Sequence, residues 1–142
     1  MAQRLTYAAP AILTAQPLVR LDETTLDVVA PCLPAAWQCN LADDSLTWDA
    51  GVFDLFGLAR DTRLERPATV AMYTDHSRAM LDRLRSHAIA TGGSFTFEAQ
   101  IVRPSGEKRW MRVSADTVVT GGRVTHLYGT KQDIIDEPAV QA

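Results

Sequence analysis

The sequence predicts one small α+β domain with an antiparallel sheet at its C-terminal end, and three observations predict it. Three segments between residues 94 and 135 alternate apolar and polar residues with the two-residue period of a β-strand. Short turns that contain glycine or proline separate these segments, so consecutive strands are expected to be neighbours. A long amphipathic segment before them has the period of a helix.

The composition limits the class of protein. With 142 residues, of which 46% are hydrophobic and 22% charged, the chain has the size and balance of one globular domain. A net charge of −3 argues against direct nucleic-acid binding, which needs a basic surface. The two cysteines form no disulfide framework, and no apolar run approaches the roughly 18 residues of a membrane span. We therefore expect a cytoplasmic protein that does not contact a membrane.

The chain is expected to begin with an arm, residues 1–34, whose first part is rich in alanine, proline and glutamine and lacks clear periodicity. Within this arm, residues 22–30 favour a short helix that the following prolines end. The compact domain is predicted at 35–136, and residues 137–142 form a tail.

The first half of the domain predicts a hairpin and several short helices. Alternation at 35–41 and a second apolar segment at 46–48, on either side of an Asp-Asp turn, indicate two paired strands. A helix is predicted at 50–56, because an aspartate that suits its N-cap precedes it and a glycine that suits its C-cap follows it. One or two further short helices are expected around 67–72.

The longest helix is predicted to begin at Thr74 or Asp75 and to end at the pair of glycines that starts with Gly92. Its apolar side is expected to hold Ser77, Met80, Leu81, Leu84, His87, Ala88 and Thr91. The opposite, solvent-facing side is expected to hold Arg78, Asp82, Arg85 and Ser86.

Each strand of the C-terminal meander has an inner and an outer face. The inner face is predicted to carry Phe95, Phe97, Ala99, Ile101, Met111, Val113, Ala115, Leu127, Gly129 and Lys131. The outer face is predicted to expose Trp110 and Tyr128 beside Arg112 and His126. Exposed aromatic residues on a sheet usually mark a surface that something covers. We therefore expect this face to bind a second copy of the chain, an effector protein or the segment 22–30.

Two stretches of the meander carry a family resemblance. The sequence Arg-Pro-Ser-Gly-Glu-Lys-Arg-Trp at 103–110, followed by Tyr-Gly-Thr-Lys-Gln-Asp-Ile at 128–134, resembles the PAS domain family with its C-terminal PAC portion. Upstream, Leu-Thr-Trp at 46–48 and Leu-Phe-Gly at 55–57 lie where such domains carry their second strand and first core helix. The resemblance covers about residues 35–136. It implies a five-stranded antiparallel sheet of order 2-1-5-4-3 with helices on one face, and a sensory or interaction role beside an effector domain.

The cofactor stays undetermined. Photosensory flavin-binding members of this family carry a reactive cysteine before the long helix, but residues 61–72 contain none. They also carry a glutamine where this chain has Lys131, so the resemblance argues against a photoactive flavin. Haem-binding members place an axial histidine where this chain has His87. We favour the alternative, in which His87 is a helix-edge residue with its polar tip in water.

The inner face either fills a core or lines a ligand pocket, and the core is the simpler interpretation. The pocket candidates are Trp37, Cys39, Trp48, Phe53, Phe56, Met80, Leu84, His87, Phe97, Met111 and Lys131. Lys131 either pairs with an anionic ligand or extends to solvent. Cys39 is interpreted as a buried apolar residue rather than a redox thiol, because no basic residue lies near it in the sequence.

The leading hypothesis is a non-catalytic sensory module that forms homodimers or binds an effector. The resemblance makes Asp133, with Arg109 or another base as its partner, a coupling residue between sensor and output; a solvated acid at a strand end is the alternative. The sequence has no nucleophile, metal or phosphate-binding motif. The alternative from another class is a small cone-shaped hydrolase or isomerase that uses His76 with Asp75 or Asp116.

Overall fold

The computed structural model describes residues 33–134. The chain divides into two units, Met1–Pro31 and Cys32–Ala142, and everything below concerns the described part of the second unit. The helix expected at 22–30 and the tail at 137–142 lie outside the described residues.

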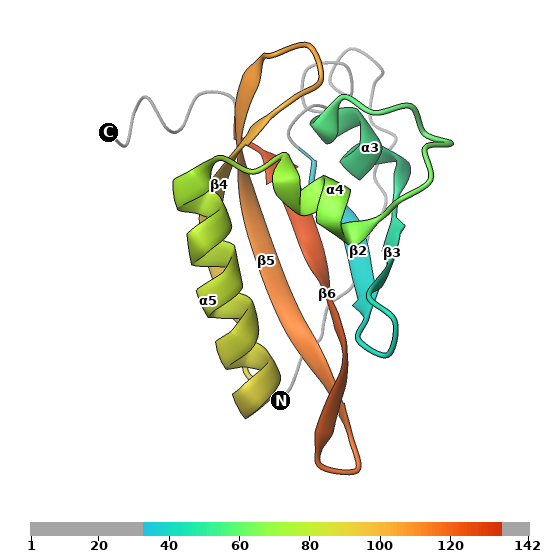
Figure 1. The fold of residues 1–142 in the computed structure, drawn as a ribbon. Coiled ribbons are helices and arrows are strands. Elements are labelled where there is room, and N and C mark those ends of the chain that lie inside the picture. The colour runs from blue at the N-terminus through green and yellow to red at the C-terminus, as the bar shows by residue number, and fades with distance from the viewer. Residues whose placement is uncertain (1–32, 135–142) are drawn as a thin grey trace, which may run out of the picture. The chain divides into compact units, whose positions relative to one another are not determined.

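Five antiparallel strands form one sheet (Figure 1). Along the chain they are β2 (Ala35–Asn40), β3 (Ser45–Trp48), β4 (Phe95–Val102), β5 (Lys108–Thr120) and β6 (Arg123–Asp133). Their order across the sheet is β3-β2-β6-β5-β4. Counted along the chain this is 2-1-5-4-3, so the order implied by the family resemblance is confirmed. The last strand, β6, therefore lies at the centre of the sheet, between β2 and β5.

Three helices lie on one face of this sheet: α3 (Ala50–Phe56), α4 (Arg66–Ala71) and α5 (Asp75–Thr91) (Figure 1). Gly57 and Gly92 take left-handed backbone conformations, each with a φ of 74°, and end α3 and α5 as predicted. Asp49 and Thr74 occupy the N-cap positions, but neither side chain makes a capping hydrogen bond.

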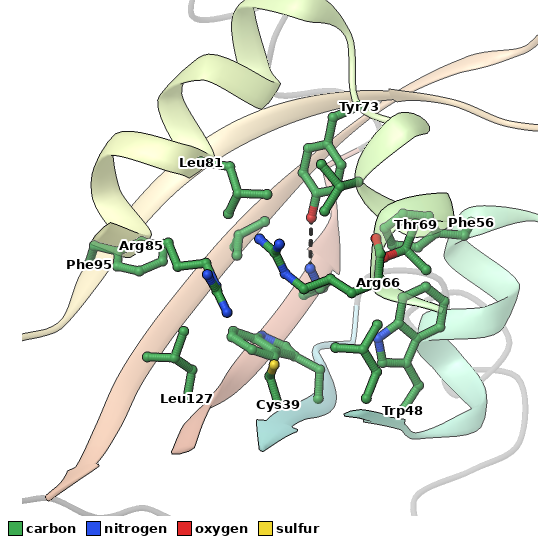
Figure 2. A pocket seen from close by; sticks show the side chains of 15 residues that line it. Cys39, Trp48, Phe56, Arg66, Thr69, Tyr73, Leu81, Arg85, Phe95 and Leu127 are labelled. Carbon is green, nitrogen blue, oxygen red and sulfur yellow. Dashed lines mark hydrogen bonds between the residues drawn. The ribbon is translucent and has the colours of Figure 1, made fainter. Parts of the chain in front are cut away.

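The sides of α5 differ from the predicted arrangement. Ser77 and Ala88 are its buried residues, whereas His87 is exposed. Arg85, expected on the solvent side, instead extends from α5 into the same interior space as Leu81 (Figure 2). The predicted buried side of α5 was rotated too far toward His87, because Arg85 was assigned to solvent as a charged residue. The hydrocarbon part of an arginine side chain can be buried while its guanidinium keeps a polar partner.

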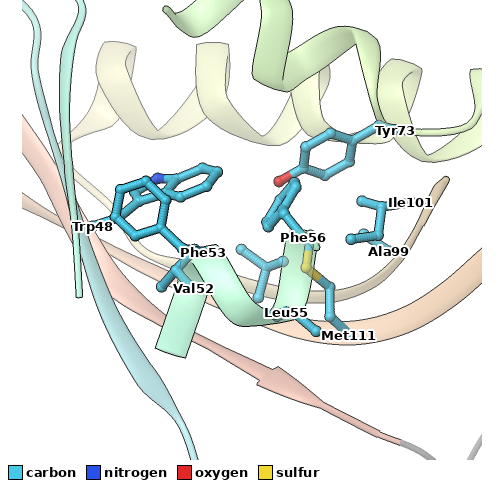
Figure 3. Close-up of a cluster of buried hydrophobic side chains, with 10 residues drawn as sticks. Trp48, Val52, Phe53, Leu55, Phe56, Tyr73, Ala99, Ile101 and Met111 are labelled. Atoms are coloured by element: carbon cyan, nitrogen blue, oxygen red, sulfur yellow. The ribbon is translucent and has the colours of Figure 1, made fainter. Parts of the chain in front are cut away.

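The core lies between the sheet and the helices. Figure 3 shows Trp48 packed against two residues of α3, with ring centroids 5.2 Å from Phe53 and 4.7 Å from Phe56. The rest of the cluster comes from both layers: Val52, Leu55, Tyr73, Ala99, Ile101, Met111 and Val113. The predicted inner face of β4 and β5 is thereby confirmed. Phe53 and Met111, two of the pocket candidates, belong to this core.

The centre of the sheet depends on a residue without a side chain. Gly129 of β6 pairs with Trp37 of β2 on one side and with Ala115 of β5 on the other. A Cβ atom at Gly129 would lie 1.9 Å from the carbonyl oxygen of Ser114. The Trp37 indole reaches across this position, and its N–H donates to the same carbonyl oxygen at 3.2 Å. Glycine therefore lets β5 approach closely and seats the Trp37 ring against the sheet.

Candidate ligand pocket

A pocket of about 50 Å³ opens between the sheet, α4 and α5, next to the aromatic core. Its lining residues are Trp37, Cys39, Leu46, Trp48, Phe56, Arg66, Thr69, Val70, Tyr73, Leu81, Arg85, Phe95, Val113, Leu127 and Lys131 (Figure 2). Pockets that bind drug-sized ligands have volumes of roughly 300–1,000 Å³. A molecule that fills this pocket without moving its walls is therefore small.

Lys131 is the most unusual residue of the pocket. It lies on the inner face of β6 and is only 8% exposed. Its Nζ donates a hydrogen bond to the Tyr73 hydroxyl oxygen at 2.8 Å (Figure 2). The ammonium also lies 5.0 Å from the ring centroid of Trp37 and 5.7 Å from that of Phe56, within cation–π range. Among residues 33–134 no carboxylate forms an ion pair with it.

Two arginines add positive charge to the same pocket. Arg85 is 19% exposed and forms an ion pair of 3.1 Å with Asp44, in the turn between β2 and β3. Arg66, in the first turn of α4, makes no ion pair with any carboxylate in the described part of the chain. Figure 2 shows the two guanidinium groups pointing toward each other across the pocket.

Cys39 lies on the floor of this pocket, and its surroundings differ from expectation. It is buried, as predicted. The prediction that nothing basic lies near it is wrong, because Arg85 and Arg66 approach it from the helices. Burial nonetheless raises the pKa of the Cys39 thiol, and the attraction of Arg85 only partly opposes this effect. The thiol form is therefore favoured, as expected for a buried apolar cysteine.

The far end of β6 joins a chain of charged groups. Arg109 pairs with Asp133, the last residue of the strand, and also with Glu107 at 3.1 Å. Glu107 in turn pairs with Arg103 at 2.7 Å, and Arg103 donates to the Asp54 carbonyl oxygen of α3 at 3.0 Å. Burial raises the pKa of the Asp133 carboxyl, with Arg109 and then Arg103 opposing it. This network, from Asp54 to Asp133, ties the end of β6 to the β4–β5 turn and to α3.

The outer face of the sheet exposes the two predicted aromatic residues, but not side by side. Trp110 is 38% exposed and Tyr128 39% exposed. Tyr128 pairs in register with Asp116, six residues from Trp110 along β5, which corresponds to about 20 Å. Polar contacts occupy the sheet between them, including a hydrogen bond of 2.9 Å between Ser114 and Thr130. The outer face therefore holds two separate aromatic positions rather than one patch.

The neighbours of these two positions differ. His126 lies opposite the exposed Val118, and Tyr128 is the next outer-face residue of β6. Arg112, closer to Trp110, forms an ion pair of 3.0 Å with Glu98 of β4. Polar residues lie directly opposite Tyr128 as well, Asp116 on β5 and Gln38 on β2. What sets this position apart is the exposed Val118, which lies diagonally beside Tyr128 toward the β5–β6 hairpin end.

Residues 45–131 match the PAS fold family, over more than half of the chain. The chain belongs to this family. A PAS domain is a sensor module of signalling proteins and is not itself catalytic. The comparison with curated proteins found no match.

Solved structures share the fold of this PAS domain at low sequence identity. The N-terminal domain of a diguanylate cyclase with a PAS/PAC sensor from Marinobacter aquaeolei has a TM-score of 0.68 and 15% identity; the match covers 75% of this chain and 99% of that one. A sensory box histidine kinase/response regulator from Burkholderia thailandensis has a TM-score of 0.67 and 14% identity, over 84% and 90% of the two chains. An RNA-binding light-oxygen-voltage receptor, at 0.65 and 15%, is matched over 74% of this chain but only 30% of its own.

The PAS domain brings five of the predicted pocket residues together: Trp37, Cys39, Trp48, Phe56 and Lys131. Phe97 packs against the core cluster, and Met80 and Leu84 are partly buried on α5, but none of the three lines the pocket. The sequence interpretation missed Tyr73, Arg66 and Arg85. Tyr73 precedes α5 in a segment without clear periodicity. Arg66 and Arg85 were not considered as pocket residues because charged residues are generally expected to face water.

Neither the haem nor the enzyme alternative finds its residues in the pocket of this PAS domain. His87 is exposed and lies outside the pocket, and so does His76, in the first turn of α5. Asp75 is exposed beside His76, and Asp116 lies on β5, outside the pocket lining. Within residues 33–134 no group of three His, Cys, Asp or Glu side chains is placed to hold a metal ion. No helix in the same range is long and apolar enough to span a membrane.

Proposed function

We propose that this PAS domain is a sensory module that binds a small ligand in the pocket around Lys131 and transmits its presence through β6. One observation carries the proposal: Lys131 lines the pocket, and two residues further along the same strand Asp133 joins the charged network. A ligand that displaces the Lys131 ammonium acts on the strand that ends in that network. The N-terminal domain of the diguanylate cyclase with a PAS/PAC sensor and the sensory box histidine kinase/response regulator share this fold, which supports the sensory role.

Native mass spectrometry of the purified full chain tests ligand binding directly. We expect the native mass to exceed the denatured mass by that of a small molecule, or to increase when candidate metabolites are added. The same ligand is then added during hydrogen–deuterium exchange. Amides of β6 and of the β4–β5 turn should exchange more slowly in the wild type, and the effect should disappear in Lys131→Met. Ligand binding that leaves β6 exchange unchanged would disprove transmission through this strand.

We also propose that the outer face of the sheet forms the contact with a second copy of the chain or with an effector. Exposed aromatic side chains at Trp110 and Tyr128 support this, since aromatic residues are enriched at protein interfaces. Arg112 and His126 lie on the same face and add polar rim groups. The two aromatic positions lie far apart, so their roles are separable by mutation.

A further inference from the structure

The charges of the pocket are unbalanced. Lys131, Arg66 and Arg85 line it, and no aspartate or glutamate of residues 33–134 does. Only Arg85 has an ion-pair partner among these residues, and that partner, Asp44, lies outside the lining. The buried Lys131 ammonium keeps one hydrogen bond, to Tyr73, and cation–π contacts, but these do not supply the negative charge that a desolvated cation favours. A bound anion would supply the missing charge.

The remaining walls describe the rest of the ligand. Trp48, Leu46, Val70 and Leu127 present apolar surface to the space that the cations border. Such walls favour a short hydrocarbon body over a fully hydrated inorganic ion. The cavity of about 50 Å³ keeps that body small.

We propose that the pocket binds a small organic acid, with its carboxylate held between the Lys131 ammonium and the guanidinium groups of Arg66 and Arg85. Guanidinium groups match carboxylates with paired N–H donors, and charge-assisted hydrogen bonds of this kind are strong in a partly dry site. The inference rests on the proposed ligand-binding function and names the chemical class of the ligand.

The test titrates the full chain at constant ionic strength with acetate, propionate and butyrate, with the matching amides, and with inorganic phosphate. Trp37 and Trp48 line the pocket, so tryptophan fluorescence reports occupancy, and calorimetry gives the affinity. We expect one of the acids to bind at least about 10-fold more tightly than its amide, the size of one charged hydrogen bond, and more tightly than phosphate.

Matched substitutions locate the binding charge. Arg66→Gln, Arg85→Gln and Lys131→Met should each weaken acid binding by about 10-fold or more. The control Arg83→Gln, an exposed residue of the same helix as Arg85, should leave it unchanged. Circular dichroism and thermal melts of each variant separate loss of binding from loss of folding.

The outcomes distinguish this inference from the proposed function. If amides bind as tightly as acids, the pocket takes a ligand but the anion proposal is wrong. If phosphate binds best, the site recognises inorganic anions and the organic-acid assignment is wrong. If nothing in the series binds and the native mass shows no ligand, both proposals fail. Acid binding that survives all three pocket substitutions would place the site elsewhere.

Discussion

The Nζ atom of Lys131 lies 2.8 Å from the hydroxyl oxygen of Tyr73, and this hydrogen bond joins the central strand to the segment between α4 and α5. Tyr73 is itself attached to the sheet edge by a bridge to Ile101 of β4. The Lys131–Tyr73 pair therefore connects the central strand β6, through the interior of the domain, to the edge strand β4. It also gives the buried ammonium its one hydrogen-bonding partner within residues 33–134.

Removing the hydroxyl should cost stability. In Tyr73→Phe the buried ammonium loses its acceptor while the aromatic ring stays, and we expect a loss of about 1–3 kcal/mol in the free energy of unfolding. Urea denaturation at 25 °C measures it. In a Lys131→Met background the same substitution should cost less than about 0.5 kcal/mol, because no ammonium needs the hydroxyl. Equal losses in the two backgrounds would show that the hydrogen bond contributes nothing.

Gly129→Ala should be among the most destabilising single-methyl changes in this domain. The new Cβ would meet the Ser114 backbone 1.9 Å away, and a paired strand cannot move aside cheaply. We expect a loss of more than about 2 kcal/mol in guanidinium denaturation, with altered Trp37 fluorescence. Gly121→Ala is the control. There nothing lies within 4 Å, and only the left-handed φ of 60° should cost about 1 kcal/mol. Similar losses at both sites would contradict the close-approach explanation.

The Arg109–Asp133 pair should make stability depend on pH. At pH 7, Arg109→Gln should cost about 1–2 kcal/mol, less than the loss of a fully buried pair because Arg109 is partly exposed. Burial holds the pKa of Asp133 above its ordinary value even with Arg109 present. The folded state therefore binds the proton of this carboxyl more tightly than the unfolded state does. The stabilising contribution of Asp133 is greatest at low pH and declines as pH rises through that raised pKa.

Without Arg109 this decline should be steeper. Glu107 has the opposite pH dependence: Arg103 and Arg109 hold its pKa below the ordinary value, so its stabilising contribution is present at higher pH and is lost as pH falls. Both carboxylates, however, interact favourably with Arg109 only when they are ionised. Urea titrations at several pH values should thus show the cost of Arg109→Gln at its full size at pH 7 and shrinking as the pH is lowered and Asp133, then Glu107, become protonated. Arg63→Gln, which breaks an exposed pair with Glu65, should cost less than about 0.5 kcal/mol throughout. A cost of Arg109→Gln that does not change with pH would rule out the ion pair as its cause.

The outer face should contribute to self-association. We expect Tyr128→Ala to weaken dimer formation more than Trp110→Ala. Both positions have polar residues directly opposite them, but the exposed Val118 adds apolar surface diagonally beside Tyr128. Sedimentation velocity over a range of concentrations measures the dimer constant. A wild-type chain that stays monomeric throughout would disprove the homodimer and leave the effector contact as the surviving proposal. Unchanged association in both variants would move the interface off this face.

The strands and helices were predictable because their signals are local. Alternation placed Trp37, Cys39 and Lys131 on the inner face correctly, since the two-residue period of a strand leaves no freedom. The strand order came from the family resemblance rather than from periodicity. The separation of Trp110 from Tyr128 follows from the β5–β6 register, in which Thr120 pairs with Arg123 beside the turn and Tyr128 lies opposite Asp116. Alternation assigns both aromatic residues to the outer face but does not give their positions along the two strands.

The cationic half of the pocket was not predictable in the same way. Arg85 pairs with Asp44, 41 positions away, and only the packing of α5 over the β2–β3 turn brings the two together. Arg66 gave no local signal either, because an arginine in the first turn of a short helix is ordinarily solvated. Pocket residues on strands can be predicted from the alternation in the sequence. Charged pocket residues on helices cannot, because their position depends on how each helix is rotated against the sheet.

The alternation of β6 has a consequence for how a signal leaves this domain. Lys131 faces the pocket, while its neighbours Thr130 and Gln132 lie on the opposite side of the same strand. A ligand and a protein partner would thus contact adjacent residues from opposite directions. Communication between them needs no relay through the interior, because the two surfaces are separated by the thickness of a single backbone.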